Sequence, residues 1–500
     1  MSTKAPLPPT GTRDFLPDAV RRRRHVQGVI SRCFERHGYE PLETPAMERL
    51  EVLLGKYGVE GDKLLFKVLH RGDKLKRVLE NPPVAESELT ELGLRYDLTV
   101  PLARVAANYP EQLTRIFKRY QIQPVWRADR PAKGRFREFY QCDVDILGSL
   151  DILAELDIFA AIGEIMDELG LGDFELHVNH RGWLSGLLSS LEVPAVAHAT
   201  VLGVLDKLDK IGPEAVLAEL AGKDVSEACR DQLPALFTAF LGACRGNPTK
   251  QPRNEKMPEM RRFEGEYRES STEKQQNGRF VAARGATEVF SDRLLDGRPQ
   301  PAAFADRVAG HPGGPEAMAQ LDAVLSWDAP RGGRIVWNPL LARGLDYYTG
   351  LIYELRIPPI PSSFGGGGRY DNLIGLFSGR PMPAVGFSFG LERVLDVLEE
   401  RGLLPSFEGH AAAVAGVLEP AHVNWTLEVV SRLRARGLSV DLYPEIAGAG
   451  KIMKWADKKK VPVVLLVGSH EVASGTIAWK NLRTGEGGTL PVDEIPSILG

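Results

Sequence analysis

Apolar side chains in the first part of the chain alternate between helical and strand-like spacing. Residues 20–37 repeat apolar positions every three or four residues, and Gly38 follows as a helix stop. Two prolines within residues 39–45 exclude a helix interior and predict an extended strand. The other predictions for this part are strands at 115–125 and 136–147, a polar turn at 128–135, an amphipathic helix at 150–169 and a strand at 174–178.

The pattern changes near residue 190. Residues 192–245 are rich in alanine and leucine at helical spacing, whereas residues 251–279 offer almost nothing apolar to bury and predict a long loop or disordered segment. Order resumes near Arg334. From there the pattern predicts strands at 335–341 and 350–357 and a strand followed by a helix over 384–400. Between them lies a run of glycines at 365–368, which we expect to form a turn or to let a ligand approach the backbone closely.

The last part of the chain, residues 408–500, reads as a separate module that begins after Leu404 and Pro405. Apolar strand-like segments alternate there with amphipathic helix-like segments. Such alternation predicts a small α/β sheet with helices on both of its faces.

Composition places the chain among ordinary globular proteins. Of its 500 residues 43% are hydrophobic and 26% charged, and this length predicts two or three domains. Lys and Arg total 62 against 66 Asp and Glu, a net charge of -4, which excludes a uniformly basic surface but allows a local basic groove. Apolar runs are too short to span a membrane and the N-terminus does not resemble a signal peptide, so we expect a cytoplasmic protein without a membrane partner.

The four cysteines, Cys33, Cys142, Cys229 and Cys244, form no C-x-x-C pair. Their spacing favours neither a zinc site nor a thioredoxin-like redox centre. We therefore expect reduced, buried thiols and no metal site in the protein itself.

Four short segments place arginines beside glycine, proline or aromatic residues. Guanidinium groups bind phosphates and carboxylates bidentately and stay charged when desolvated. Each segment also has a purely structural explanation, since basic hairpin tips and glycine turns are common. The sequence contains no P-loop, which leaves arginine-based phosphate binding as the nucleotide chemistry to consider. The segments are residues 125–135, 342–350, 364–371 and 386–393.

In this order and at these separations, the segments resemble class II aminoacyl-tRNA synthetases, and specifically the histidyl-tRNA synthetase family. RGLDYYTG at 343–350 is similar to a histidine-specific box that other class II enzymes lack, and GGGGRYD at 365–371 to the second such box. Residues 38–48 resemble motif 1, residues 119–148 motif 2 and residues 386–394 motif 3. LRYDLTVP and FYQCDVDI resemble the eukaryote-like branch, whereas many bacterial members read Pro-Glu-Gly-Thr at the first of these places.

The resemblance implies a mixed α/β fold, with a class II catalytic core built on an antiparallel sheet. Pro45 matches a motif 1 proline that lies at the dimer interface in relatives, so a homodimer is implied as well. The implied domains are 1–190, the first part of the core; 191–330, a mainly helical insertion with a polar flexible stretch; 331–405, the second part of the core; and 408–500, an anticodon-binding domain.

The resemblance also implies a reaction in two steps. L-histidine and ATP, accompanied by Mg²⁺, form histidyl-adenylate and pyrophosphate, and the histidyl group then passes to tRNA(His). Because two anions react in the first step, charge neutralisation and positioning should dominate catalysis. Arg127, Arg343 and Arg393 match the catalytic arginines, and Arg127, Asp129, Arg135 and Arg393 match ATP-binding positions. Asp129 stands where motif 2 usually has a glutamate.

For the amino acid, the matched positions divide into two groups. Asp97, Thr99 and Gln141 correspond to the amino-group site, and Asp145 with Tyr347 or Tyr348 faces the imidazole. A buried acceptor for an imidazole N–H rejects other amino acids by ~10⁴-fold or more, because they leave it unpaired. The structural alternative for Asp143 and Asp145, which alternate along one strand, is a solvated strand face.

Cations in two places correspond to tRNA-binding positions. Arg130 and Lys133 lie in the motif 2 loop, which can touch the acceptor end of the tRNA. Lys451, Lys454 and Lys458 lie around Trp455 in the last module, and cations interleaved with an aromatic ring suit phosphate contact and base stacking. A solvated helix face is the alternative for these lysines.

The alternative function is that of a catalytically silent, synthetase-like regulatory subunit of ATP phosphoribosyltransferase. Such paralogues typically lack the anticodon-binding module and degrade the RGLDYY box. Both features are intact in this sequence. The residues therefore favour the enzyme, a histidine–tRNA ligase.

Overall fold

The computed structural model describes residues 6–54, 64–80, 83–132, 134–205, 208–221, 294–295, 298–342, 347–406 and 411–499. The polar segment 251–279, together with the other residues from 222 to 293, lies outside this description. The fold divides into two compact units, Met1–Asp14 with His25–Leu403 and Phe15–Arg24 with Leu404–Gly500. The finer division into a catalytic core and an insertion at 191–330 stays a prediction.

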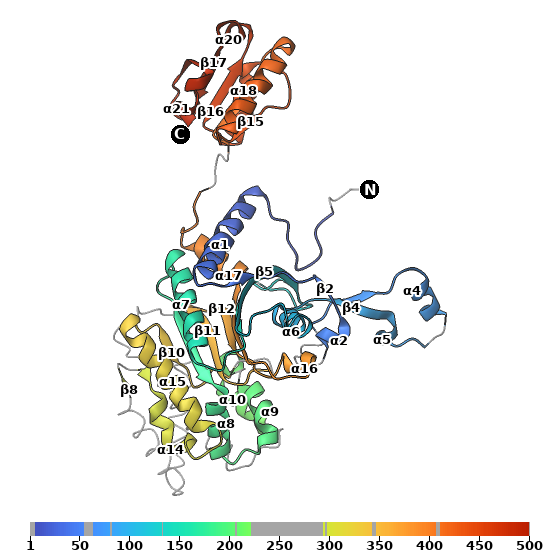
Figure 1. The fold of residues 1–500 in the computed structure, drawn as a ribbon, viewed down its shortest axis with the longest axis vertical. Helices are drawn as coiled ribbons and strands as arrows, with labels where there is room; N and C mark the ends of the chain where they lie inside the picture. The colour runs from blue at the N-terminus through green and yellow to red at the C-terminus, as the bar shows by residue number, and fades with distance from the viewer. Residues whose placement is uncertain are drawn as a thin grey trace. The chain divides into compact units, whose positions relative to one another are not determined.

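Before residue 404 the chain alternates helices and strands (Figure 1). The helices are α1 Pro17–Arg36, α2 Leu50–Leu53, α4 Gly72–Leu79, α5 Glu86–Leu89, α6 Thr99–Asn108, α7 Leu153–Glu168, α8 Arg181–Ser190, α9 His198–Leu205, α10 Leu208–Ala221, α14 Ala305–Val308, α15 Gly314–Asp328, α16 Gly375–Ser378 and α17 Leu391–Glu400. The strands are β1 Glu40–Pro41, β2 Met47–Arg49, β3 Lys67–Leu69, β4 Thr90–Leu94, β5 Phe117–Trp126, β6 Glu138–Leu147, β7 Glu175–His180, β8 Leu294–Leu295, β9 Arg298–Pro299, β10 Ile335–Trp337, β11 Leu351–Ile357, β12 Ile360–Arg369 and β13 Ala384–Gly390.

An eight-stranded sheet in the order β1-β5-β6-β13-β12-β11-β7-β10 organises this part. Its inner strands pair antiparallel, and the two edge pairs, β1 with β5 and β10 with β7, are parallel. The expected antiparallel core sheet is therefore confirmed. Helix α7 packs on β6 and β13, with the Phe159 ring 4.8 Å from that of Tyr353 in an edge-to-face contact.

Most of the elements expected from the sequence are present, including α1, α7, β5, β6, β7, β11, β13 and α17. The strand expected over 39–45 is shorter, because only Glu40–Pro41 pairs with β5. The strand expected at 335–341 ends at Trp337, before Asn338 and Pro339. The glycine run at 365–368 is no turn, because it lies within strand β12 in the middle of the sheet.

The residues after 410 form the predicted small α/β domain. Its sheet has the order β15-β14-β16-β17-β18, and separate apolar clusters on the two faces involve α18 and α19. Both faces are thus covered, as the sequence predicts. The elements are β14 Ala413–Val417, α18 Val423–Ala435, β15 Val440–Leu442, α19 Ala449–Lys458, β16 Val463–Val467, α20 Ser469–Ser474, β17 Thr476–Asn481, β18 Gly487–Pro491 and α21 Pro496–Leu499.

Two further expectations can be compared with the described residues. Cys33 and Cys142 are buried free thiols, as expected, while Cys229 and Cys244 lie outside the description. Within the described ranges, no helix has both the length and the apolar composition needed to cross a membrane.

Candidate active site

The two faces of the eight-stranded sheet differ sharply in polarity. On β6, Cys142, Val144 and Ile146 point to the face that α7 covers, so the alternate residues Gln141, Asp143 and Asp145 point to the other face. The antiparallel register places polar residues of β5 directly beside them, which makes continuous polar rows across the sheet. The pairs are Arg119 with Asp145, Gln121 with Asp143, and Gln123 with Gln141.

Asp145 is held by groups on two sides of this polar face. Its Oδ2 lies 2.7 Å from Nη2 of Arg119, which is wholly buried, and its Oδ1 accepts a hydrogen bond from the Tyr370 hydroxyl. Burial raises the pKa of Asp145, and the Arg119 guanidinium opposes that rise. Gly386 lies beside Asp145 on β13, where a Cβ atom would overlap the carboxylate oxygen. Glycine is therefore required there by close approach.

Asp143 and Gln141 each have a buried side-chain oxygen that accepts no hydrogen bond from the described residues. Asp143 is 2% exposed, and neither its Oδ1 nor Oε1 of Gln141 has a hydrogen-bond partner among the described residues. The Gln141 amide nitrogen is engaged, since it donates to the Ser388 hydroxyl at 2.8 Å. Burial, opposed by Arg119 and reinforced by Asp145, raises the pKa of Asp143 to about 7. Unpaired buried acceptors cost stability, so this pair is a natural receptor for a cationic donor.

Asp97 and Thr99 reach the same place from the start of α6. Asp97 is 2% exposed, and its Oδ1 accepts from the backbone N–H of Val100 at 3.3 Å. Burial and the nearby Asp143 raise the pKa of Asp97 to about 7, while Arg127 opposes the rise. The fold thus brings three of the predicted amino-group residues, from α6 and β6, into one buried acidic cluster with Asp143.

Tyr347 and Tyr348 form an aromatic wall over the cluster. Their rings are 4.9 Å apart in an edge-to-face contact, and the Tyr347 ring lies 5.8 Å from that of Tyr370. Burial, reinforced by Tyr348 and Asp97, raises the pKa of Tyr347 well above its usual value, so the hydroxyl stays protonated. A Cβ atom on Gly368 would come 2.9 Å from the Tyr348 ring, which explains one glycine of the run in β12.

Two of the three predicted catalytic arginines, Arg127 and Arg393, follow the ends of β5 and β13, which lie at the same end of the sheet because both strands pair antiparallel with β6. Arg127 follows the last residue of β5, donates from Nε to the Tyr96 carbonyl at 2.9 Å and lies 5.1 Å from the Phe139 ring centroid. No carboxylate of the described residues forms an ion pair with it. Arg393, in the first turn of α17, donates to the Ser363 carbonyl at the start of β12. Arg343 lies outside the described residues.

Within the loop at 128–135, which resembles part of motif 2, two oppositely charged side chains form an ion pair. Nη2 of Arg135 lies 2.7 Å from Oδ1 of Asp129, so these two predicted ATP-binding residues form an ion pair with each other. Arg137 fixes the loop further by donating from Nε to the Asp129 carbonyl at 3.1 Å. Arg130 is exposed, and Lys133 lies outside the described residues.

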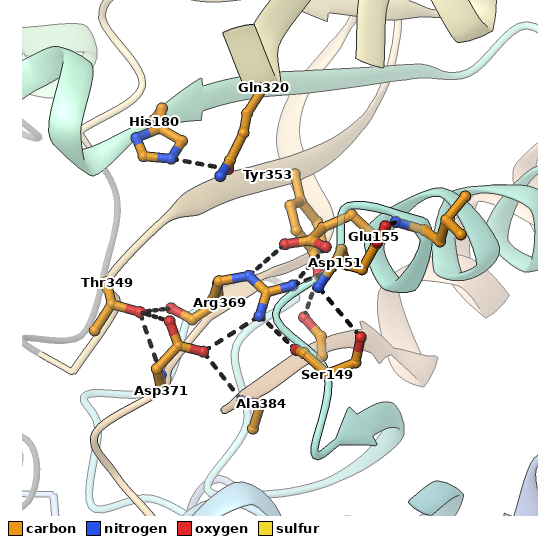
Figure 2. A network of polar contacts seen from close by, with 12 residues as sticks. Ser149, Asp151, Glu155, His180, Gln320, Thr349, Tyr353, Arg369, Asp371 and Ala384 are labelled. Atoms are coloured by element: carbon orange, nitrogen blue, oxygen red, sulfur yellow. Dashed lines mark hydrogen bonds and ion pairs between the residues drawn. The ribbon is translucent and has the colours of Figure 1, made fainter. Parts of the chain in front are cut away.

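Arg369 of the second histidine-box segment is bound within the protein (Figure 2). Its Nε and Nη2 each lie 2.7 Å from an oxygen of Glu155 on α7, and its Nη1 donates to the Ser149 carbonyl at 2.8 Å. Asp371 accepts from Nη1 at 3.3 Å and from the Thr349 hydroxyl at 2.9 Å. This arginine therefore ties α7 to the end of β12, and the neighbouring Tyr370 is the residue of the box that reaches the acidic cluster.

Residues 386–390 also match the G-x-S-x-G pattern of hydrolase nucleophile elbows. Ser388, however, lies inside β13 and pairs in register with Asp143, and the strand continues to Gly390. A serine on an extended strand is not presented on a strained turn, so this segment is no nucleophile elbow.

In the C-terminal unit, Lys451, Lys454 and Lys458 are exposed on α19, and Lys451 pairs with Glu445. Trp455 packs edge-to-face on Tyr443 with ring centroids 5.2 Å apart, and Lys459 lies 4.1 Å from its ring centroid. Both a ring and a cation therefore contact the indole, and base stacking on Trp455 stays a prediction.

Reasoning from the sequence missed Arg119, Ser388 and the acceptor role of Asp143. Arg119 alternates with Gln121 and Gln123 along β5, a polar series that marks the same buried face as the acids of β6. That alternation is a signal, but it identifies a site only once the pairing register is known.

Comparisons with known proteins agree with this geometry. The family described as histidyl-tRNA synthetase matches residues 11–243 and 275–394, and the anticodon binding domain family matches residues 412–500. Histidine–tRNA ligases of Christiangramia forsetii and Cytophaga hutchinsonii are 35% and 36% identical to the chain, and each alignment covers at least 98% of both proteins. The crystal structure of histidyl-tRNA synthetase from Nostoc sp. PCC 7120 is similar with a TM-score of 0.70 at 26% identity, covering 98% of each chain. The chain belongs to the histidyl-tRNA synthetase family.

Proposed function

We propose that the chain attaches L-histidine to tRNA(His), with MgATP as the second substrate and AMP and pyrophosphate as products. The observation that carries the proposal is the buried acceptor cluster beneath the tyrosine wall, with arginines at one end of the same sheet face. An amino acid whose ammonium group and ring N–H both donate hydrogen bonds fits such a cluster. The names of the relatives, which match over nearly the full chain, support the same activity.

Histidine lies along β6 in this proposal. Its ammonium group is held by Asp97, Asp143 and the Oε1 atom of Gln141, and Thr99 flanks that group. Its imidazole faces Asp145 together with Tyr347 or Tyr348. Gln141 and Asp145 are four residues apart, or about 13 Å along an extended strand. That length accommodates the amino acid and leaves its carboxylate at the end where Arg127 lies.

The first step joins the histidine carboxylate to the α-phosphorus of ATP, and the bond from that phosphorus to the leaving pyrophosphate breaks. No general base is required, because an α-carboxyl group is already ionised at neutral pH. Arg127 and Arg343 neutralise the α-phosphate, and Arg393 holds the far end of the triphosphate. Asp129 and Arg135 exchange their mutual ion pair for contacts with the nucleotide. Loss of one such arginine contact costs about 3–4 kcal/mol of transition-state stabilisation.

In the second step, a hydroxyl of the terminal adenosine of the tRNA attacks the histidyl carbonyl and AMP leaves. We assign Arg130 and Lys133 to the acceptor end. Lys451, Lys454 and Lys458 are exposed cations of the unit that matches an anticodon binding domain, so we assign them to phosphates of the anticodon arm. Mg²⁺ belongs to the nucleotide, since this ion prefers phosphate oxygens and water to a dedicated protein cage. A homodimer in the cytoplasm, with Pro45 near the interface, completes the proposal.

The experiment that tests this function is ATP–pyrophosphate exchange with each proteinogenic amino acid in turn, with and without tRNA. We expect exchange with histidine alone and its loss in Arg343→Ala or Arg127→Gln. Arg334→Gln is the matched control, because that arginine pairs with Asp167 on the protein surface. Histidine binding without exchange under any condition would favour the regulatory-subunit function instead.

The regulatory alternative has weaker support. A structure titled as an ATP phosphoribosyltransferase regulatory subunit/histidyl-tRNA synthetase, from Bacillus halodurans, matches with a TM-score of 0.62 but at 19% identity, which indicates a shared fold only. The full-length relatives at 35% and 36% identity are histidine–tRNA ligases.

A further inference from the structure

Away from the acidic cluster, α1 and α7 bring a thiol, an imidazole and a carboxylate together. Cys33 and His37 are four residues apart, and the His37 N–H donates to the Cys33 carbonyl at 3.1 Å, so the helical turn carries both side chains on one face. Glu164 projects from α7, which lies alongside α1 (Figure 1). The candidate ligand atoms of these three residues all lie within 4.8 Å of one another.

The end of α1 fixes the direction of the chain after His37. Gly38 has a φ of 78°, its N–H donates to the Glu35 carbonyl at 2.9 Å, and the Tyr39 N–H donates to the Phe34 carbonyl at 3.0 Å. These bonds define a Schellman cap, which needs a left-handed residue at the position of Gly38. The cap turns Tyr39 back toward α7.

A second carboxylate, from Asp157 of α7, supports the imidazole. Its Oδ1 lies 3.7 Å from Nδ1 of His37, while its Oδ2 accepts from the Tyr39 hydroxyl at 2.6 Å and lies 2.9 Å from Nζ of Lys118. On the other side of the ring, Nε2 of His37 lies 2.7 Å from Oε2 of Glu164. Metal-bound histidines are commonly oriented in this way, with a carboxylate on the ring nitrogen that does not bind the ion.

The surrounding charges suit a divalent cation. Arg36 holds Oε1 of Glu164 at 2.6 Å and Oε2 of Glu168 at 2.7 Å, which leaves Oε2 of Glu164 directed at the imidazole. Lys118 balances Asp157. Arg32 and Arg36 share Glu168. The two anionic ligands themselves, the Cys33 thiolate and the Glu164 carboxylate, would balance the charge of a divalent ion.

We propose that Cys33, His37 and Glu164 bind a divalent transition-metal ion of the zinc class, with the fourth coordination position open to water. Sulfur, imidazole nitrogen and carboxylate oxygen are the ligands that zinc prefers, and three protein ligands leave one position free. The His37 and Glu164 side chains are 19% and 41% exposed, which gives the ion a route from solvent. The site is independent of the proposed function.

Binding exchanges one proton for one metal ion. Without the ion, Cys33 donates its S–H to the Ala161 carbonyl at 3.5 Å, and burial with the neighbouring Glu164 raises the pKa of the thiol to about 12. On binding, the thiol proton leaves to solvent, the sulfur bonds to the metal, and the hydrogen bond between His37 and Glu164 opens. The C-x-x-x-H spacing on one helix, completed by a residue far away in sequence, escapes a search for C-x-x-C pairs, so the proposal revises the expectation that the protein holds no metal.

The test is a Co²⁺ titration of the full-length protein after chelator treatment. We expect one equivalent of Co²⁺ to produce a thiolate-to-cobalt charge-transfer band in the near ultraviolet, and Zn²⁺ to remove it. Cys33→Ser should abolish the band, and Glu164→Gln should weaken binding without disturbing the apolar packing. Asp157→Asn should weaken it by ~10–100-fold, the usual effect of a carboxylate that orients a ligating histidine.

Two controls separate this site from other thiols. Cys142→Ala removes the buried thiol of β6, and Cys229→Ser with Cys244→Ser removes the remaining two; all should keep the band. Circular dichroism of Cys33→Ser verifies that it is folded. Absence of a thiolate band from the chelator-treated wild-type protein, or its persistence in folded Cys33→Ser, would overturn the proposal.

Discussion

Replacing Asp143 with asparagine tests which end of histidine the acceptor cluster holds. The amide keeps the shape of the side chain but removes the charge from a residue that is 2% exposed and whose Oδ1 has no partner among the described residues. A hydrogen bond to a charged group contributes about 1.5–3 kcal/mol, equivalent to roughly 10- to 150-fold in affinity. We expect the KM for histidine in pyrophosphate exchange to rise by that factor, with the KM for ATP unchanged.

Two analogues locate the lost interaction on the ligand. Histidinol keeps the ammonium group and the imidazole, whereas imidazolepropionate keeps the imidazole and the carboxylate but lacks the ammonium group. Calorimetry should show weaker binding of histidinol to Asp143→Asn and unchanged binding of imidazolepropionate. An equal loss for both ligands, or no loss for either, would refute the assignment. Asp173→Asn, which breaks an exposed ion pair with Arg401, is the control for an unspecific loss of charge.

Three further predictions concern stability and histidine binding. Asp143→Asn should raise the melting temperature of the ligand-free protein more at pH 8 than at pH 5.5. The pKa of Asp143 is about 7 in the folded protein and 3.8 ordinarily, so the wild-type protein loses stability as the pH rises from the lower to the higher of these values. Denaturant unfolding should show a loss of about 1.5–3 kcal/mol for Glu155→Gln, which removes the charge-assisted bidentate partner of the buried Arg369 guanidinium, but only ~0–1 kcal/mol for Asp167→Asn on the same helix, whose ion pair is exposed. Gly386→Ala should abolish histidine binding, because its Cβ would overlap a carboxylate oxygen, whereas Gly450→Ala, with nothing within 4 Å of the added Cβ, should leave both binding and the melting temperature close to wild type.

The local sequence pattern was sufficient to predict a helix or a strand wherever one signal, such as apolar periodicity or a helix-ending glycine, dominates the segment. The stop at Gly38, the long apolar periodicity of α7 and the β-branched runs of β5 and β6 all lie close to their predicted positions. The turn that we considered for the glycine run at 365–368 was wrong, because glycine has a weak strand propensity of its own and the pattern therefore gave no sign of a strand. It forms a central strand since the rings of Tyr348, Tyr353 and Phe387 occupy the space where side chains would be. Packing decided that segment, not propensity.

The site shows the same division. Residue types in characteristic boxes were enough to identify the family, to locate the acids of β6 and to indicate arginine-based chemistry, because these depend on short stretches of chain. Which arginine can contact substrate and which stabilises the fold depends on partners far away in sequence. Arg369 is paired with Glu155 and Arg119 with Asp145, whereas Arg127 forms no ion pair with a carboxylate of the described residues. Pairing register and burial set those partnerships. They arise only when the strands assemble, since the charge state and availability of a side chain are properties of its surroundings.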